Sequence, residues 1–395
     1  MSEVNISPVS PAIRVHPVRA TVGAVTTTIA CVLPVFLLGG LAVQMGSELR
    51  FSPAGLGLAV SVYFGMSALA SVPSGALVER YGSAAVARSG ILLAAAMLAA
   101  IGIFARSYPA LLVLLAVSAV ANALGQLASN SALARHVPVG RQGLSFGLKQ
   151  AAIPLSTLLA GAAVPTVALT AGWRWAFVAG AGAALAALLL VPNGQRVSAD
   201  TGDGGEERAT GALVMIGVAA TLAAGSAGSL GTFLVDSAVV RGLSPGLAGL
   251  TLTFGSAVCV AARVLGGHLA DRRVGGEIAT IAGMLVVGAV GLALLAAEGP
   301  APLVAGVLLG FGLGWAWPGV MNFAVVRLHP QAPAAATSIT QTGVYAGGCL
   351  GPLGLGPLAA EAGYPTMWKV AAVAMLLAAA LMLTGARLLH RHVGA

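Results

Sequence analysis

Two basic residues, Lys149 and Arg263, lie inside long apolar stretches of the sequence. A charge in such a stretch is costly, so it normally faces a wet cavity or a partner. No aspartate or glutamate occupies the middle of an apolar stretch, so neither cation has an evident counter-ion in the chain. At 1.5 Å per helical residue, both cations lie about 10 Å inside the same side of a membrane. We therefore expect an anionic solute to be their partner.

Each cation also has a structural alternative. Lys149 can extend its ammonium group to lipid headgroups while its methylene chain stays in the apolar region. Arg263 can pair with Asp271, on the same predicted helix, or donate to backbone carbonyls. In these cases neither side chain would contact a solute.

Uncharged polar side chains recur at helical spacing near the two cations. Asn122, Gln126 and Asn130 are four residues apart, as are Gln341 and Tyr345, so each set shares one helix face. Such groups can hydrogen-bond a solute or hold helices together. The residues that we expect to contact the solute, with Trp315 or Trp317 as an apolar wall, are Arg263, Lys149, Gln150, Asn122, Gln126, Gln341, Tyr345, Tyr63, Trp315 and Trp317.

The elements that must position these residues are membrane-spanning helices. The chain has 395 residues, only 8% of them charged, and a mean hydropathy of +0.94. A span needs roughly 20 apolar residues, and twelve such spans account for nearly the whole chain. We therefore expect an all-α membrane protein with 12 transmembrane helices. The apolar runs fall at 21–47, 54–77, 84–105, 109–134, 143–169, 173–192, 210–236, 246–270, 277–297, 301–328, 334–360 and 366–389.

A polar segment divides these runs into two sets of six. It covers 193–209 and predicts a cytoplasmic linker between six-helix bundles at 21–192 and 210–390, with cytoplasmic tails at 1–20 and 391–395. Thirteen lysines and arginines fall on the side of the N-terminus and five on the other side. Positive charge favours the cytoplasmic side. We expect a multi-pass protein of the plasma membrane or cell inner membrane with both termini in the cytoplasm.

The two halves also share residues at a constant offset of 192. The matches include helix starts, a charged loop and the end of the fourth run, which chance would not supply in one order. The matched pairs are Ser52-Pro53 with Ser244-Pro245, Gly75 with Gly267, Glu79 with Asp271, Arg80 with Arg272, Asn130 with Asn322, and Arg135 with Arg327. Duplicated halves are a recurring plan of secondary transporters, with the solute site between them.

The charged loops carry a specific resemblance. The run from Gly75 to Gly82 resembles the signature loop between helices two and three of the major facilitator superfamily, and the run from Gly267 to Arg273 resembles its copy in the second half. The resemblance implies two pseudo-symmetric bundles that alternate access to a central site, and a gate at these loops. The expected gating residues are Gly75, Glu79, Arg80, Asp271, Arg272, Arg273, Arg135, Arg327, Asn130 and Asn322. At the opposite side, Glu48 is expected to pair with Arg50, and Asp236 with Arg241, and an outer gate formed by these residues is the alternative.

The run from Lys149 to Pro154 resembles organic-anion and cyanate-type porters of that superfamily, and the Gly-Pro-Gly-Gly pattern of its drug/proton antiporters is missing from the fifth run. We expect a monomeric secondary transporter for a small anion, most simply a carboxylate, in the lipid bilayer, with proton coupling and exchange both open. A drug or metabolite exporter is the alternative. No enzyme motif, metal spacing or nucleotide loop occurs, so we expect no catalytic residue, cofactor, metal or nucleic-acid partner.

Overall fold

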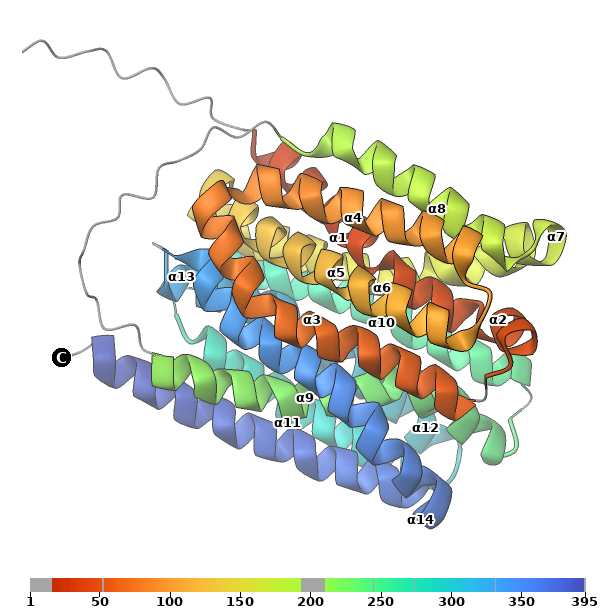
Figure 1. Ribbon diagram of the computed structural model, residues 1–395. Helices are drawn as coiled ribbons and strands as arrows, with labels where there is room; N and C mark the ends of the chain where they lie inside the picture. The colour runs from red at the N-terminus through yellow and green to blue at the C-terminus, as the bar shows by residue number, and fades with distance from the viewer. Residues whose placement is uncertain are drawn as a thin grey trace, which may run out of the picture.

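The computed structural model describes residues 16–51, 53–192, 210–243, 245–273, 275–330 and 332–393. Every regular element in these ranges is helical, and the long helices lie roughly parallel or antiparallel to one another (Figure 1). The first half holds α1 (Pro17–Gly40), α2 (Ala42–Leu49), α3 (Pro53–Tyr81), α4 (Ser83–Phe104), α5 (Tyr108–His136), α6 (Val139–Ala163), the π-helix η1 (Val164–Ala168), α7 (Leu169–Ala171), α8 (Trp173–Ala187) and the 3₁₀ turn η2 (Leu188–Leu190). The second half holds α9 (Thr210–Val240), α10 (Pro245–Asp271), α11 (Glu277–Leu294), α12 (Pro300–Leu309), the π-helix η3 (Gly310–Gly314), α13 (Pro318–Leu328) and α14 (Pro333–Val393).

Ten of the described helical stretches are long and apolar enough to cross a membrane. They do not include α6, whose first half carries Arg141, Gln142, Lys149 and Gln150. The ten also count α14 as one stretch, although its backbone leaves the helical region at Gly363 and the chain doubles back there (Figure 1). The all-α membrane fold is confirmed, and the number of twelve spans stays a prediction. The predicted linker at 193–209 lies outside the described residues.

Single glycines let successive helices reverse direction without a long loop. Gly82 joins α3 to α4 with a φ of 85°, and Gly363 divides α14 with a φ of 79°. Positive φ is accessible to glycine at little cost and is unfavourable for residues with a Cβ atom. These one-residue connections keep neighbouring helices antiparallel and close.

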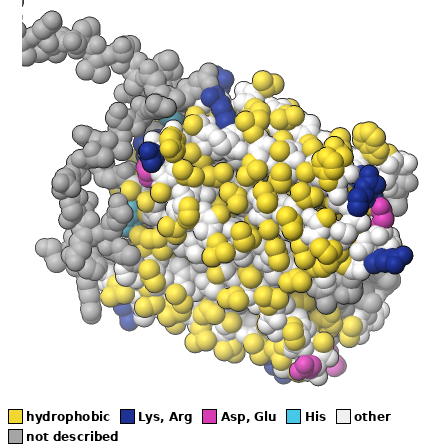
Figure 2. Space-filling model, viewed as in Figure 1, with side chains coloured by type: hydrophobic (Ala, Val, Ile, Leu, Met, Phe, Trp, Pro, Cys, Tyr) yellow, Lys and Arg dark blue, Asp and Glu magenta, His cyan; other side chains and the backbone are white. Residues whose placement is uncertain are grey.

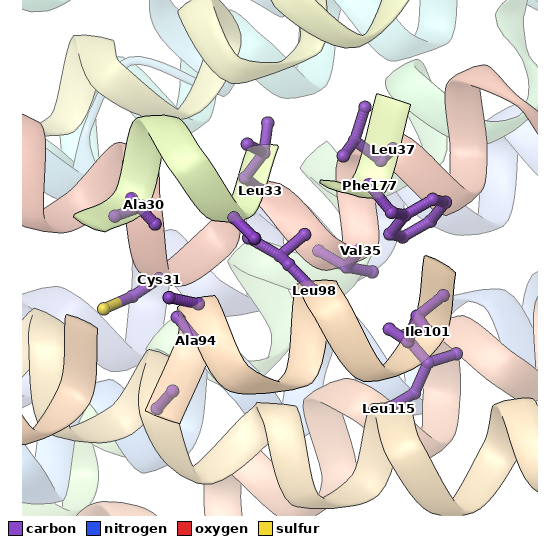
Figure 3. Packing of buried hydrophobic residues seen from close by; sticks show 14 of the residues in the cluster. Ala30, Cys31, Leu33, Val35, Leu37, Ala94, Leu98, Ile101, Leu115 and Phe177 are labelled. Carbon is purple, nitrogen blue, oxygen red and sulfur yellow. The ribbon is translucent and has the colours of Figure 1, made fainter. Parts of the chain in front are cut away.

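Each half has its own apolar core. The core of the first half draws on α1 to α6 and α8 and includes Ala334 of α14, and that of the second half draws on α9 to α14. In Figure 3, Leu33 and Leu37 of α1 lie near Leu98 of α4 and Phe177 of α8, and the last two are fully buried. Because lipid is as apolar as these side chains, close van der Waals packing rather than escape from water holds the helices together.

The charged side chains are concentrated near the two ends of the molecule. Figure 2 shows apolar side chains across the middle of one face, with lysine, arginine and acidic residues toward its edges. One end carries Glu79 and Asp271 and is called the motif end here; the other carries Glu48. This distribution matches an apolar slab bounded by two aqueous layers.

The two halves meet along two helix pairs related by the internal repeat. Helix α3 packs against α14, and α6 packs against α10. The 192-residue offset carries α3 onto α10 and the start of α6 onto the start of α14. The interface therefore contains two equivalent helix contacts, and the internal repeat relates the contact of α3 with α14 to the contact of α10 with α6.

Candidate functional site

Lys149 is fully buried in α6 and reaches toward α5. Its Nζ donates to Oε1 of Gln126 and, at 2.8 Å, to Oδ1 of Asn130. These residues are four apart on α5, as their spacing predicts, and both are buried. The extension of Lys149 to the headgroups is therefore wrong, because its ammonium group is enclosed between helices. Its hydrogen-bond partners among the described residues are all neutral oxygens.

Arg263 is 2% exposed in α10 and links the two halves. Its Nη1 donates to the carbonyl of Gln150, in the first half, at 2.6 Å. Its Nη2 and Nε donate to the carbonyl of Trp315, in the second half, at 2.9 and 3.3 Å. The guanidinium carbon lies 6.0 Å from the centre of the Trp315 ring. Of the two structural alternatives, pairing with Asp271 is wrong and donation to carbonyls is what the structure has.

Two interruptions of the helical ladder supply these carbonyls. Residue 154, which would donate to the Gln150 carbonyl in a regular helix, is a proline inside α6 and has no backbone N–H. Trp315 follows the π-helix η3 and precedes α13, where the regular i to i−4 pattern is broken. The guanidinium therefore satisfies acceptors that the backbone leaves free. Sequence reasoning noted Pro154 but missed this consequence, although the four-residue spacing from Gln150 was visible.

The two cations belong to one local environment. Lys149 and Gln150 are adjacent in α6, and Arg263 is close enough to Lys149 to act on it electrostatically. None of the three ion pairs among the described side chains includes either cation. Two like charges thus lie near each other among neutral groups.

A second polar group of side chains lies across the interface from α5 to α14. The Tyr345 hydroxyl faces the side-chain amides of Asn122 and Gln341, and all three side chains are at most 4% exposed. Apart from one another, the hydroxyl and the oxygens Oδ1 of Asn122 and Oε1 of Gln341 have no hydrogen-bond partner among the described residues. Unsatisfied buried polar atoms cost about 1–3 kcal/mol each, so they mark a place where a ligand or water can bind. Gln150 Oε1 is likewise unpaired.

The remaining expected solute residues take different positions. The Tyr63 hydroxyl donates to the Cys31 carbonyl at 2.9 Å, which is a contact between helices of the first half. Trp315 is partly buried and packs edge-on against Phe311, beside Arg263. Trp317 is fully buried, with its Nε1 unpaired. The structure thus places Trp315 beside Arg263, whereas the Tyr63 hydroxyl is used in a hydrogen bond within the first half.

At the motif end, Glu79 and Asp271 each cross to the other half. Oε1 of Glu79 accepts from the backbone N–H of Ala334 in α14 at 3.0 Å. Oδ1 and Oδ2 of Asp271 accept from the N–H groups of Gly143 and Leu144 in α6 at 2.6 and 2.9 Å. Both carboxylates lie near the positive N-terminal end of a helix, which stabilises their charge. They therefore join the halves at repeat-related positions.

The arginines of the motif end differ between the halves. Arg135 pairs with Glu79 at 2.7 Å, whereas Arg327 pairs at 2.8 Å with Glu277, which the sequence did not indicate. Arg80, Arg272 and Arg273 are exposed: Arg80 lies over the Tyr81 ring, and Arg273 bonds the Thr280 hydroxyl. Asn130 binds Lys149, while both polar atoms of the fully buried Asn322 are unpaired.

Small residues bring the halves into backbone contact at this end. A Cβ atom on Gly143 or Gly267 would overlap the carbonyl oxygen of the other residue. A Cβ on Gly75 would lie 2.9 Å from that of Ser338 in α14. The glycines of the two motifs therefore serve close helix approach beside the two carboxylates.

At the opposite end, Glu48 pairs with Arg174 at 2.5 Å and accepts from Trp173 Nε1 at 2.7 Å. The hydrogen bond from Arg174 lowers the pKa of Glu48, and burial opposes this only in part. The expected pairing with Arg50 is wrong, because Arg50 has left-handed backbone and follows the end of α2. The Asp236 side chain lies outside the described residues.

Comparison with known proteins agrees with this architecture. The sequence model described as "Major Facilitator Superfamily" matches residues 24–352 and 213–392. The chain belongs to this superfamily. It is 27% identical over 337 residues to a chloramphenicol resistance protein of Streptomyces lividans, covering 80% of this chain and 83% of that protein. The resemblance of the motif loops is therefore confirmed.

Solved structures share the fold of this superfamily member. The fucose:proton symporter FucP of E. coli matches with a TM-score of 0.72 and 16% identity, over 93% of this chain and 98% of that chain. The human organic anion transporter MFSD10 matches with a TM-score of 0.71 and 16% identity, over 95% of this chain and 100% of that chain. The proton:xylose symporter XylE matches with a TM-score of 0.74 and 15% identity, over 93% of this chain and 95% of that chain. At these identities the likeness establishes the fold, and the chain is a multi-pass transporter rather than an enzyme.

No cluster of three histidine, cysteine, aspartate or glutamate side chains suited to a metal occurs among the described residues. The three cysteines are free, and Cys31 and Cys259 are buried in helix packing. The polar groups between the halves, rather than a metal, are therefore the candidate site.

Proposed function

We propose that this transporter moves a small organic anion across the plasma membrane by alternating access, with the motif end in the cytoplasm. The observation that carries the proposal is the pair of buried cations, Lys149 and Arg263, whose hydrogen-bond partners among the described residues are all uncharged. A carboxylate bound nearby would supply the missing negative charge and accept hydrogen bonds from both cations. The solute would then join groups from the two halves.

The contacts at the motif end suit a gate in this mechanism. Those of Glu79 and Asp271 are hydrogen bonds to backbone N–H groups in the first two turns of α14 and α6, and they form or break as units when the halves separate. With these bonds made, the motif end is closed, so solute would enter from the opposite end. Opening would expose Gly143 and Ala334 N–H groups to water, which replaces the lost bonds.

A second candidate function is export of a neutral antibiotic. It is favoured by the chloramphenicol resistance relative and by the unpaired polar groups of Asn122, Gln341 and Tyr345, which can bind an uncharged solute. Under this function the two cations would serve only to hold α6, α5 and the Trp315 segment together.

Uptake into proteoliposomes separates the two functions. Labelled lactate and labelled chloramphenicol would be offered to the wild type and to Arg263→Gln, with imposed pH gradients to detect proton coupling. Arg387→Gln, which removes an exposed arginine, is the matched control. We expect carboxylate uptake that Arg387→Gln retains and Arg263→Gln loses by about 100-fold, since removing a buried charge costs several kcal/mol. Transport of chloramphenicol without any carboxylate would reject the anion.

A further inference from the structure

The hydrogen-bond network between the helices fixes the orientation of three buried amides, those of Asn122, Gln126 and Asn130. The Ser67 hydroxyl donates to the Ala119 carbonyl at 3.2 Å, so it accepts from Asn122, whose Nδ2 lies 3.1 Å away. This orientation leaves Oδ1 of Asn122 as the free atom, which is an acceptor. The two amide orientations near Lys149 follow in the same way, because an ammonium group can only donate.

Those two amides point their oxygens at the cation. Oε1 of Gln126 and Oδ1 of Asn130 accept from Lys149, and Nδ2 of Asn130 is left without a partner. Near the cations, the free atoms are thus one donor, Nδ2 of Asn130, and one acceptor, Oε1 of Gln150, and both lie beside two positive charges. This part of the interface suits a carboxylate, which accepts and carries negative charge.

One helical turn away, the free amide atoms are oxygens, which are acceptors. Asn122 lies four residues before Gln126 on the same face of α5, about 6 Å from it. Here the free atoms are the amide oxygens of Asn122 and Gln341, contributed by opposite halves, beside the Tyr345 hydroxyl. Amide oxygens need donors, and the Tyr345 hydroxyl, which carries a single proton, can donate to only one of the two.

We infer that the solute is a hydroxylated carboxylate rather than a simple one. Its carboxylate lies at Lys149 and Arg263, and its hydroxyl groups donate to the oxygens of Asn122 and Gln341. A hydroxyl fits this position better than an ammonium group, because the neutral amides give no counter-charge and the two cations nearby repel a positive group. The inference rests on the proposed anion transport and adds the chemical class of the anion.

Initial uptake rates of labelled propionate, lactate, glycerate and alanine in proteoliposomes test this inference. The first three are carboxylates of similar size with zero, one and two hydroxyl groups, and alanine is the zwitterion. We expect glycerate and lactate to exceed propionate in kcat/KM by about tenfold or more, because a site built to bond a hydroxyl rejects an analogue without it. Alanine should be transported more slowly than lactate.

Two variants in opposite halves then locate the preference. Asn122→Leu and Gln341→Leu remove the acceptors while keeping the volume, and each should lower glycerate uptake toward the propionate rate without abolishing the latter. Ser156→Ala removes a buried hydroxyl that bonds within α6, at the Ala152 carbonyl, and should keep the wild-type preference. If one leucine variant does not fold, the other still reports on the site.

The outcomes separate the inference from the proposed function. Equal uptake of propionate, lactate and glycerate, or preference for alanine, would overturn the hydroxylated carboxylate while anion transport stands. An unchanged preference in a folded Asn122→Leu or Gln341→Leu variant would overturn it too. If none of the carboxylates is taken up, the proposed function itself fails, and the inference fails with it.

Discussion

The two halves of the molecule use equivalent positions alike at the motif end and differently in the middle. Glu79 and Asp271 are related by the 192-residue offset, and Glu79 accepts one backbone N–H group and Asp271 two, within the first two turns of a helix in the other half. In the middle, Lys149 corresponds to Gln341, and Arg263 to Ser71. The duplicated contact thus forms the frame, and the residues that depart from the duplication supply the charge.

The asparagines of the repeat show what this departure does. Asn130 binds Lys149, whereas Asn322 corresponds to it and is fully buried with both polar atoms unpaired. The position of Gln126 is held by Pro318 in the second half. One half therefore encloses a cation in amide oxygens, and the other keeps the asparagine without the cation. A bound solute would accordingly be held asymmetrically.

The largest expected effect comes from moving the lysine to the other half. Lys149→Gln should lower carboxylate uptake by about 100-fold, and adding Gln341→Lys should not restore it, because Pro318 offers no side-chain oxygen where Gln126 has one. Initial uptake rates in proteoliposomes at equal protein content measure this. Recovery to within about threefold of the wild type would show that the halves are interchangeable.

The next effect concerns the two repeat-related carboxylates. Asp271→Asn removes a charged carboxylate that accepts hydrogen bonds from two backbone N–H groups. Glu79→Gln removes a charged carboxylate that accepts from one backbone N–H group and pairs with an exposed arginine. Hydrogen bonds to charged groups are worth about 1.5–3 kcal/mol and exposed ion pairs much less, so opening of the motif end should increase about 100-fold and about 10-fold respectively.

Spin labels report this opening. In a cysteine-free background, Val139→Cys and Leu328→Cys place labels on exposed residues of opposite halves at the motif end. The distance distribution should gain a longer component in Asp271→Asn, and a smaller one in Glu79→Gln. Identical distributions in both variants and the parent would mean that these bonds do not hold the end closed.

A smaller effect is expected at Pro154. Pro154→Ala restores a backbone N–H that competes with Arg263 for the Gln150 carbonyl, so the guanidinium should lose one partner and carboxylate kcat/KM should fall about 3–10-fold. Pro73→Ala, within α3 at an exposed position, is the matched control and should have no such effect on uptake. Equal effects of the two substitutions would show that Pro154 acts only by bending its helix.

The smallest effect is at the opposite end, where Glu48 binds only residues of its own half among the described side chains. Because Arg174 lowers the pKa of Glu48, this pair stabilises the fold above the ordinary pKa of about 4.5 and ceases to do so as pH falls through the lowered value. Glu48→Gln should therefore lower Tm by about 1 °C at pH 7 and have a progressively smaller effect as the pH falls below the lowered pKa of Glu48. Thermal unfolding across this range measures the difference, which would be constant with pH if the ion pair were irrelevant.

The sequence was sufficient for the architecture because its signals are local or repeated. Apolar runs predict helices, and one offset relates the halves. The location of Glu79 and Asp271 at the same end of the molecule follows from these two signals. The partners of the charged residues were not predictable in this way. Whether Arg327 meets Asp271 or Glu277, and whether Lys149 points to lipid or to Gln126, depends on how each helix is rotated in the packed molecule.

The central claim is that the buried cations bind an anion between the halves, and equilibrium binding tests it most directly. Calorimetric titration of glycerate into the purified wild type, Lys149→Met and Lys369→Met compares the loss of a buried lysine with the loss of an exposed one. The account predicts saturable binding to the wild type and to Lys369→Met, and at least about 30-fold weaker binding to Lys149→Met. Equal affinity in all three proteins would contradict it.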